Sequence, residues 1–363
     1  MATDIETIGM LRDSAARYAE DNYGFHQRWA VLERPEGYSP DAWRDFAELG
    51  FLALRLPEEE GGLDGDAFAV GALMEIVGAR LLMEPFFAST VVGTGLLLKL
   101  GSAQQRAAYL PQLADGSLVL ALADDDEPGR PCVVSGDRLQ GGKIGVLHGD
   151  AAGRLLVSAR DAVTGQAVVV TVAANAPGLT RQVYRLVDGR GAARFGFDDV
   201  VVERLAPESG LSAADALAVA RDEAMVALCA ESLGVVNSLV AATTEYLKVR
   251  KQFGRPIGSN QALQHRMVDC FLLQQEVQAL TEAAQQALAD DSADRSRRVA
   301  GARAYIVQAA RKIANEAVQM HGGVGVTDEL DISHYFRRLM VNAALCGGRD
   351  AQFSRFVDAA LAA

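Results

Sequence analysis

The chain has 363 residues, of which 50% are hydrophobic and 23% are charged, and its formal net charge is −12. The length predicts two or three packed subdomains, and the composition is typical of globular proteins. The acidic balance argues against nucleic acid or an anionic membrane as the main partner, because both bind clustered Lys and Arg. The sequence shows no long apolar run, no signal-peptide pattern and no paired-cysteine spacing, so we expect a cytoplasmic protein without a transmembrane span.

The first part of the chain, residues 1–117, is predicted to be helical. Ser39 and Pro40 supply an N-cap and a proline at the first helical position, and apolar residues follow at helical spacing. The stretch VVGTGLLL contains Gly93 and Gly95 but lacks the rest of a dinucleotide fingerprint, so we expect these glycines to pack helices together.

The pattern changes at about residue 118 and again at about residue 208. Residues 118–207 form short runs that are rich in β-formers, and turn residues separate the runs. They predict an antiparallel β-domain, because the β-α-β alternation of a doubly wound sheet is missing. Residues 208–363 return to the helical period, and Gly322 and Gly323 are expected to end a long helix. The predicted fold class is therefore α+β, with an N-terminal helical domain, a middle β-domain and a C-terminal helical bundle.

Two stretches of the C-terminal part combine residue types that bind ligands. In TTEYLKVRKQFGRPIGSNQALQH, Arg250 precedes a Phe-Gly turn and Gln261 opens the next helix, which together offer a guanidinium, an aromatic ring and an amide. In NEAVQMHGGVG, Gln319 comes just before glycines that let backbone approach a flat or phosphate-bearing ligand. A surface helix with an aromatic turn and an ordinary helix end explain the same residues without a ligand. The basic clusters at 295–298 and 336–338 could also meet an anion.

Together the two stretches resemble the acyl-CoA dehydrogenase family. R-K-x-F-G and Q-x-x-G-G-x-G form a specific pair of signatures, and Gln319 follows Arg250 by 69 residues. The order of helical, β and helical parts, predicted at 1–117, 118–207 and 208–363, matches the three-domain fold of that family across nearly the whole chain. FLALRLPEEEGGL resembles its N-terminal signature, and LALADDDEPGR resembles the segment where its β-domain begins to cover the flavin.

The resemblance implies an oxidoreductase that binds FAD and an acyl-CoA thioester. A carboxylate would take the α-proton of the thioester while the β-hydride passes to the flavin, and an electron-transfer flavoprotein would accept the electrons. FAD would lie between the β-domain and the C-terminal helices, with contacts across subunits of a homo-oligomer or a heteromer. The residues that the resemblance puts at FAD are Asp126, Arg250, Gln252, Phe253, Gln261, Gln319, Gly322 and Gly323.

Both positions that carry the catalytic glutamate in this family hold other residues here. One lies 27 residues after the motif glutamine, where this chain has Cys346 followed by Gly347. The other lies 26 residues before the motif arginine, where this chain has Ala224. Glu223 is adjacent and is the candidate catalytic base, although neighbouring helical residues point about 100° apart, so that it would act only after a local shift.

Further departures affect the flavin and the CoA. Asp126 stands where the family has a threonine that contacts the flavin ring, and GVLHG at 145–149 replaces its Trp-x-Thr stretch. The run ADDDE would put several negative charges beside an electron-rich ring, which is unfavourable. Asp222 matches an acidic position near the CoA adenylate, but Met225 replaces the arginine expected three residues later.

Three hypotheses remain open. In the first, the chain is an active acyl-CoA dehydrogenase that uses Glu223 as a displaced base. In the second, it is a catalytically silent subunit of a heteromer and completes the FAD site of a base-bearing partner. In the third, the fold serves another flavin reaction, in which Cys346 contacts the substrate. The small residues of NAALCGG predict a roomy cleft and a bulky acyl group, as in lipid or steroid catabolism.

Overall fold

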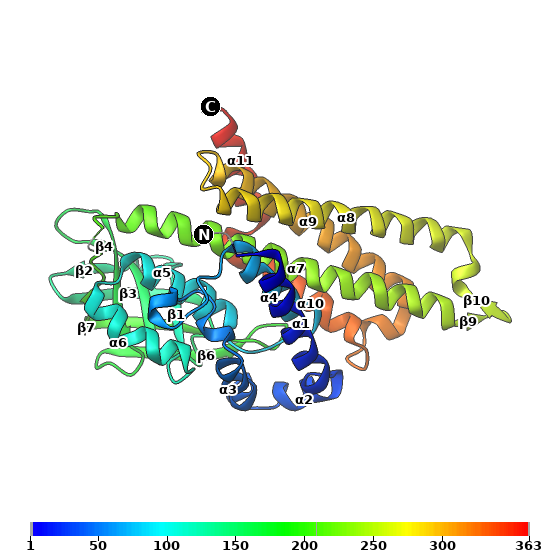
Figure 1. Cartoon of the computed structure of the whole chain (residues 1–363), viewed down its shortest axis with the longest axis horizontal. Coiled ribbons are helices and arrows are strands. Elements are labelled where there is room, and N and C mark those ends of the chain that lie inside the picture. The colour runs from blue at the N-terminus through cyan, green and yellow to red at the C-terminus, as the bar shows by residue number, and fades with distance from the viewer. Residues whose placement is uncertain (1–2, 208, 362–363) are drawn as a thin grey trace. The chain divides into compact units, whose positions relative to one another are not determined.

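The computed structural model describes residues 3–207 and 209–361, which divide into two compact units (Figure 1). Among these residues, unit 1 comprises 30–65 and 83–224, and unit 2 comprises 3–29, 66–82 and 225–361. Helix α7 (Ala213–Val249) begins in unit 1 and continues into unit 2.

Unit 1 opens with short helices whose ends follow from the local sequence. In α3 (Pro40–Glu48) the Ser39 hydroxyl accepts a hydrogen bond from the Ala42 backbone N–H at 3.2 Å, which confirms the predicted N-cap. A buried π-helix, η3 (Phe87–Gly93), leads directly into α5 (Thr94–Leu100). The other helical segments are η1 (Phe51–Ala53), η2 (Glu58–Glu60) and α6 (Ala103–Ala114), and α2 (Phe25–Leu32) enters from unit 2.

The β-domain of unit 1 is an eight-stranded sheet in the order β6-β7-β3-β2-β4-β5-β8, with β1 beside β4. Most pairs are antiparallel, but β1 and β2 both run parallel to β4, so the sheet is mixed and the prediction of a purely antiparallel sheet was wrong. Apolar alternation has the same period in both directions, so it cannot report the direction of a neighbouring strand. The strands are β1 (Leu120–Ala123), β2 (Val133–Ser135), β3 (Arg138–Leu147), β4 (Arg154–Asp161), β5 (Ala167–Ala173), β6 (Leu179–Arg185), β7 (Gly191–Val201) and β8 (Glu203–Arg204).

Unit 2 is a helical bundle built around α9 (Arg295–His321), which packs against α8 (Gln261–Ala289), α10 (Asp331–Ala344) and α11 (Gly348–Leu361). Helix α9 ends at Gly322, whose φ of 67° lies in the left-handed region, so the predicted glycine stop is confirmed. The remaining elements are α1 (Ile5–Asn22), α4 (Ala67–Ala79), β9 (Lys251–Gln252), β10 (Arg255–Pro256), η4 (Ile257–Ser259), η5 (Gly322–Val326) and η6 (Leu345–Gly347).

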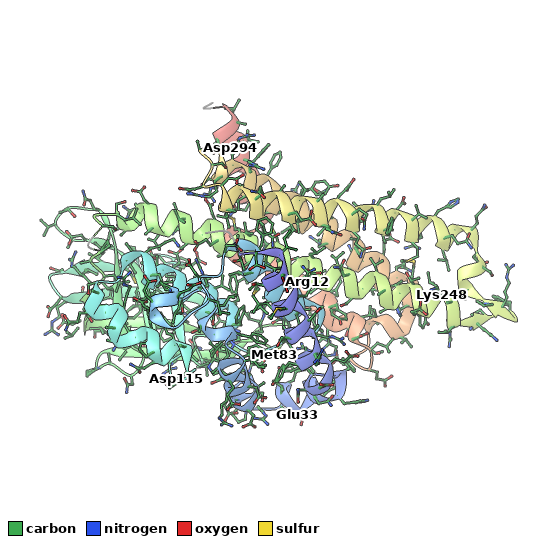
Figure 2. The ribbon with its side chains drawn as sticks, in the orientation of Figure 1. Arg12, Glu33, Met83, Asp115, Lys248 and Asp294 are labelled. Atoms are coloured by element: carbon green, nitrogen blue, oxygen red, sulfur yellow. The ribbon has the colours of Figure 1, made fainter. Side chains whose placement is uncertain are left out.

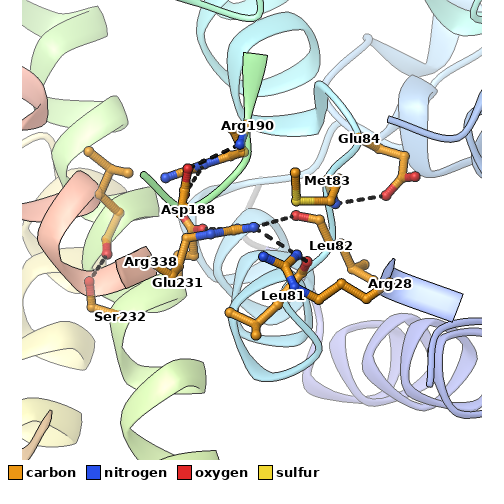
Figure 3. A network of polar contacts seen from close by, with 11 residues as sticks. Arg28, Leu81, Leu82, Met83, Glu84, Asp188, Arg190, Glu231, Ser232 and Arg338 are labelled. Carbon is orange, nitrogen blue, oxygen red and sulfur yellow. Dashed lines mark hydrogen bonds and ion pairs between the residues drawn. The ribbon is translucent and has the colours of Figure 1, made fainter. Parts of the chain in front are cut away.

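A buried ion pair fixes α10 against α7 within unit 2 (Figure 3). Arg338 Nη1 donates to Glu231 Oε1 at 2.7 Å, and its Nη2 donates to the Leu81 and Leu82 carbonyls at 3.3 and 2.9 Å. Arg28 donates to the same Leu81 carbonyl at 2.7 Å. Both ion-pair side chains are 0% exposed, so loss of Arg338 would leave a buried carboxylate without its ion-pair partner, at a cost of about 3–5 kcal/mol.

Helix α7 has the length and composition of a membrane span. Its most apolar 18-residue window has a mean hydropathy of 1.7. Since 78% of that window is buried inside the protein, however, α7 has the environment of a core helix.

Candidate functional site

Glu223, the candidate base, lies in an ion-pair cluster with Arg55 and Lys99. Arg55 makes a bidentate contact, from Nη2 to Oε1 at 3.0 Å and from Nη1 to Oε2 at 3.2 Å. Lys99 Nζ donates to Oε1 at 2.7 Å. All three residues belong to unit 1, and their side chains are between 13% and 21% exposed. Two cations therefore share one carboxylate in a region that is largely shielded from water.

The local backbone makes room for Arg55. Its Nη1 also donates to the Val91 carbonyl in the π-helix at 2.5 Å, and π-helices are often found at functional sites. A Cβ added at Gly95 would lie 2.0 Å from the same Nη1, so a larger residue would displace the guanidinium. Gly95 was predicted to pack helices together, but the group that approaches it is this charged side chain.

The cluster sets the protonation state of Glu223. Burial raises the pKa of its carboxyl group, but the charges and hydrogen bonds of Arg55 and Lys99 outweigh that effect, so the pKa lies below the ordinary value. A general base works best when its pKa lies near the operating pH. The environment of Glu223 therefore favours a permanently ionised carboxylate and opposes the predicted role as a base.

The two positions that carry the catalytic base in the family hold Ala224 and Cys346 in this chain. Ala224 is buried and has no titratable group. Cys346 is half-buried and adopts a left-handed backbone with φ of 58°, and the next two residues, Gly347 and Gly348, also have positive φ. The Gln352 side chain donates to the Cys346 carbonyl at 2.6 Å and holds this turn. The turn is well defined, but no carboxylate stands at its first residue.

Asp126, predicted to contact the flavin, is engaged within the β-domain. Its Oδ1 lies 2.7 Å from Lys143 Nζ and accepts a hydrogen bond from the Cys132 backbone N–H at 3.1 Å. Lys143 is 1% exposed and also donates to the Asp124 carbonyl and the Ser158 hydroxyl, at 2.7 and 3.0 Å. The lysine therefore joins Asp126 to the end of strand β1 and the middle of strand β4.

Two other acidic side chains of this segment, Asp124 and Glu127, also have cationic partners. Asp124 receives two hydrogen bonds from Arg221, at 2.8 and 2.9 Å. Glu127 pairs with Arg130 at 3.0 Å and contacts Arg194 as well. The negative charges of this segment are therefore largely offset by cations, of which Arg130 is close in sequence and Lys143, Arg194 and Arg221 are distant. Burial and the nearby Asp124 raise the pKa of Asp125.

This half of a flavin site fits an isoalloxazine ring poorly. The stretch GVLHG at 145–149, which the resemblance matches to the Trp-x-Thr stretch of the family, offers neither an indole nor a hydroxyl donor. A carboxylate such as Asp126 accepts hydrogen bonds and donates none when ionised. Its Oδ1 is already engaged by Lys143 and a backbone amide. We derive no flavin chemistry from the β-domain of this chain.

The predicted FAD contacts of unit 2 lie in a different environment. Strands β9 and β10 form a hairpin at the junction of α7 and α8, just after Lys248, which is labelled in Figure 2. Phe253 at its turn has a φ of 51° and is 101% exposed. Arg250 and Gln252 are exposed as well, and no described residue makes an ion pair with the Arg250 side chain. The hairpin presents these groups away from its own chain.

The second signature lies at the end of α9, where Gln319, Gly322 and Gly323 are all exposed. A stacked pair joins this helix end to α7: the rings of Tyr246 and His321 are 4.2 Å apart at 26°. The end of α7, just before Arg250, and the end of α9, which carries Gln319, are thus held together. Sequence analysis missed His321, because its stacking partner is 75 residues away.

The remaining candidates differ in their exposure to solvent. Asp222, predicted near the CoA adenylate, is 0% exposed, whereas Gln261 is exposed at the start of α8. Of the basic clusters, 295–298 pairs with acidic side chains of the preceding turn, and 336–338 contributes the buried Arg338. In the described ranges, no group of three or more His, Cys, Asp and Glu side chains could hold a metal ion.

Two cavities lie away from these residues. One, of about 660 Å³, is enclosed by α1, α4, α7, α8 and α9 within unit 2. The other, of about 540 Å³, lies in unit 1 beside Asp150 and Arg185. None of the predicted site residues lines either cavity.

Known proteins resemble this chain over nearly its whole length. Residues 6–117 match the family model for the acyl-CoA dehydrogenase N-terminal domain, and residues 212–361 match that for the C-terminal domain. Acyl-CoA dehydrogenase IpdE2 of Mycobacterium tuberculosis is 30% identical over 346 residues, which cover 94% of each chain. Similar solved structures include the ChsE4–ChsE5 complex from M. tuberculosis, with a TM-score of 0.92 and 25% sequence identity over 99% of this chain and 98% of the matched chain. They also include the Tcur3481–Tcur3483 steroid ACAD, with a TM-score of 0.89 and 29% identity over 98% of both chains.

Proposed function

This chain belongs to the acyl-CoA dehydrogenase family, and from that premise we propose that it is a catalytically silent subunit of a heteromeric acyl-CoA dehydrogenase. The observation that carries the proposal is the state of Glu223. The carboxylate nearest to the missing base is tied to two cations, while Ala224 and Cys346 occupy the two base positions. α,β-Dehydrogenation requires a group that accepts the α-proton, and none of these positions provides one.

The chain's contribution is then to bind and orient the cofactor of a base-bearing partner. Arg250 offers a guanidinium suited to a pyrophosphate, and Gln252 and Gln319 offer amides. Phe253 offers a fully exposed ring that can cover an adenosine. FAD held by the partner would supply the hydride acceptor, and an electron-transfer flavoprotein would reoxidise the assembly.

The similar solved structures support this division of labour. Both are named as pairs of chains, and one is named as a steroid ACAD. For this chain we infer a bulky acyl-CoA thioester, such as a steroid-derived one, as the substrate of the heteromer. The small residues before Gly347 are consistent with that size.

The test is to produce the chain alone and together with the base-bearing acyl-CoA dehydrogenase chain of its own genomic neighbourhood. We expect no flavin absorbance and no turnover from the chain alone, and both from the complex. In the complex, Glu223→Gln should leave turnover unchanged, as should the matched control Glu75→Gln, which removes another ion-paired carboxylate.

The active alternative makes the opposite prediction. A yellow homo-oligomer that turns over an acyl-CoA by itself, and that loses turnover but keeps FAD in Glu223→Gln, would overturn the proposal. Glu223 would then be a base in spite of its ion pairs.

A further inference from the structure

The cavity of about 660 Å³ lies within unit 2, where α1 and α4 meet helices of the C-terminal part of the chain. Helix α4 packs against α1 and against α8. It also lies close to α7, because a Cβ added at Gly78 would be 2.0 Å from the Glu231 carbonyl oxygen, and one added at Gly234 would be 1.9 Å from that of Glu75. The walls are thus tightly packed helices, and the volume lies in the range of small-molecule sites, about 300–1,000 Å³.

Most polar side chains that line this cavity are already paired with one another. Glu75 accepts hydrogen bonds from Arg12 and Asn237, at 3.1 and 3.2 Å. Gln278 donates to Glu282 at 3.0 Å. Such groups hold the walls together and contribute little to binding a ligand, because their hydrogen-bonding capacity is largely used.

Gln285 on α8 is different, because its amide is buried without a partner. The residue is 7% exposed and lines the cavity, and its side chain makes no hydrogen bond to any residue that the structure describes. A Cβ added at Gly71 on α4 would lie 1.8 Å from Gln285 Nε2, so the amide occupies the space beside this glycine. A buried amide without a hydrogen bond is costly, and a glycine inside a helix is costly as well. Both features point to a ligand that pairs with the amide.

Arg298 on α9 supplies a cation to the same cavity. Arg295 and Arg297 of its basic cluster pair with aspartates of the preceding turn. Arg298 is half-buried and forms no ion pair with a described residue, and its Nη2 lies 3.4 Å from the Ala283 carbonyl oxygen. A guanidinium has five N–H donors and binds carboxylates in a bidentate manner, so most of its donors remain for an anion.

We propose that this cavity binds a small hydroxy acid, with its carboxylate at Arg298 and its hydroxyl at the Gln285 amide. An amide can donate to a hydroxyl oxygen and accept from its hydrogen, so it satisfies that group fully. One cation without an ion pair, in a cavity that Glu282 also lines, favours a single negative charge over a phosphate dianion. The carbon skeleton would lie against the apolar lining residues, which are Ile8, Phe68, Ala72, Ala230, Leu233 and Ala279.

The probe for this site is 8-hydroxyoctanoate, and octanoate and octane-1,8-diol each lack one of its two polar groups. The full chain is titrated with each probe by calorimetry. We expect Gln285→Met to weaken binding of 8-hydroxyoctanoate about fivefold and to leave octanoate unchanged, because only the hydroxyl loses its partner. Arg298→Met should weaken both carboxylates about tenfold and leave the diol unchanged.

The matched controls are Gln308→Met and Arg297→Met. Gln308 is exposed on α9, and neither residue lines the cavity. Each control should change the affinity for 8-hydroxyoctanoate less than about twofold. Equal melting temperatures of the chains without probe would verify that all four variants fold.

Three results would overturn the inference. In the first, the parent chain binds 8-hydroxyoctanoate no more tightly than octanoate. In the second, the substitutions at Gln285 and Arg298 leave that affinity unchanged, so that the probe binds elsewhere. In the third, Gln285→Met weakens octanoate as much as the hydroxy acid, so that the amide shapes the cavity and does not hold the hydroxyl. Flavin and turnover in the chain alone would contradict the proposed function and would not change these expectations.

Discussion

Unit 1 and unit 2 treat their predicted site residues in opposite ways. In unit 1, Glu223 and Asp126 are both held by cations of the same unit. In unit 2, Arg250, Gln252 and Phe253 stand exposed on a hairpin. Polar groups that are mutually satisfied stabilise the fold but are not available to a ligand. Groups that extend into solvent contribute little to folding and remain available to a partner.

This difference separates two functions, proton abstraction and cofactor binding, that one active chain would combine. In unit 1, Glu223 and Asp126, the residues predicted as base and flavin contact, are held in ion pairs. The positions that would reach a neighbouring cofactor have kept side chains suited to that contact. Substitutions at the ion-paired residues of unit 1 should therefore lower the stability of the chain. Substitutions at the exposed hairpin residues of unit 2 should instead weaken ligand binding.

Among substitutions that affect the predicted site residues, the largest effect is expected from Arg55→Met. It removes the bidentate partner of a largely shielded carboxylate and leaves only Lys99 beside Glu223. The free energy of unfolding, measured with urea, should fall by about 2–3 kcal/mol.

Arg12→Met is the control for this substitution. Arg12 forms an ion pair with Glu75, but its side chain is 52% exposed, so its loss should cost less than about 1 kcal/mol. Equal losses in the two variants would show that the Glu223 cluster is not a structural element.

The next largest effect is expected on FAD binding, from a substitution beside the β9–β10 hairpin. Arg250→Ala should leave the unfolding free energy of the chain unchanged, because the side chain is exposed and forms no ion pair within the described residues. In the complex, it should weaken FAD binding by about 1.5–3 kcal/mol, the range for a hydrogen bond to a charged group. Titration of the apo-complex with FAD measures this change. Unaltered FAD affinity would mean that the hairpin does not reach the cofactor.

Sequence analysis succeeded where the cause of a structure is local. The Ser39 N-cap, the glycine stop at Gly322 and the turn at Phe253 each depend on a few neighbouring residues. It failed where the cause is distant in the chain. The partners of Glu223 lie 168 and 124 residues away, and no spacing rule connects them.

The same limit applies to the β-domain. The run of acidic residues at 124–127 suggests repulsion when it is read alone. The cations that neutralise it include Lys143 on β3 and Arg221 on α7, which only the folded chain brings near. Candidate ligand-binding residues could be proposed from the motifs. The sequence could not predict whether each of these side chains is available to a ligand or already paired within the chain.

A smaller effect distinguishes a lowered pKa of Glu223, as in an ion pair, from the raised pKa that a general base would have. Its folded-state pKa lies below the ordinary value of 4.5, so its stabilising contribution is fully present above that value and is lost as pH falls through the folded-state pKa. The stability difference between the parent chain and Glu223→Gln should stay constant at about 1–2 kcal/mol from pH 7 to about pH 5, and should shrink below about pH 4.5. Urea unfolding at several pH values measures it. A difference that grew in acid would indicate a raised pKa, as a poised base would have.

The smallest effect on folding is expected at the hairpin turn. Phe253 holds a left-handed φ of 51°, a conformation that is uncommon for a bulky residue and that Asn adopts more readily. Its ring is fully exposed, so Phe253→Asn removes no packing from its own chain. The unfolding free energy should therefore stay within about 0.5 kcal/mol of the parent value or rise slightly, while binding of the partner's FAD weakens. A marked loss of stability would show that the ring serves its own fold. The expected result would mean that an aromatic residue is retained there, against local preference, for contact with a second chain.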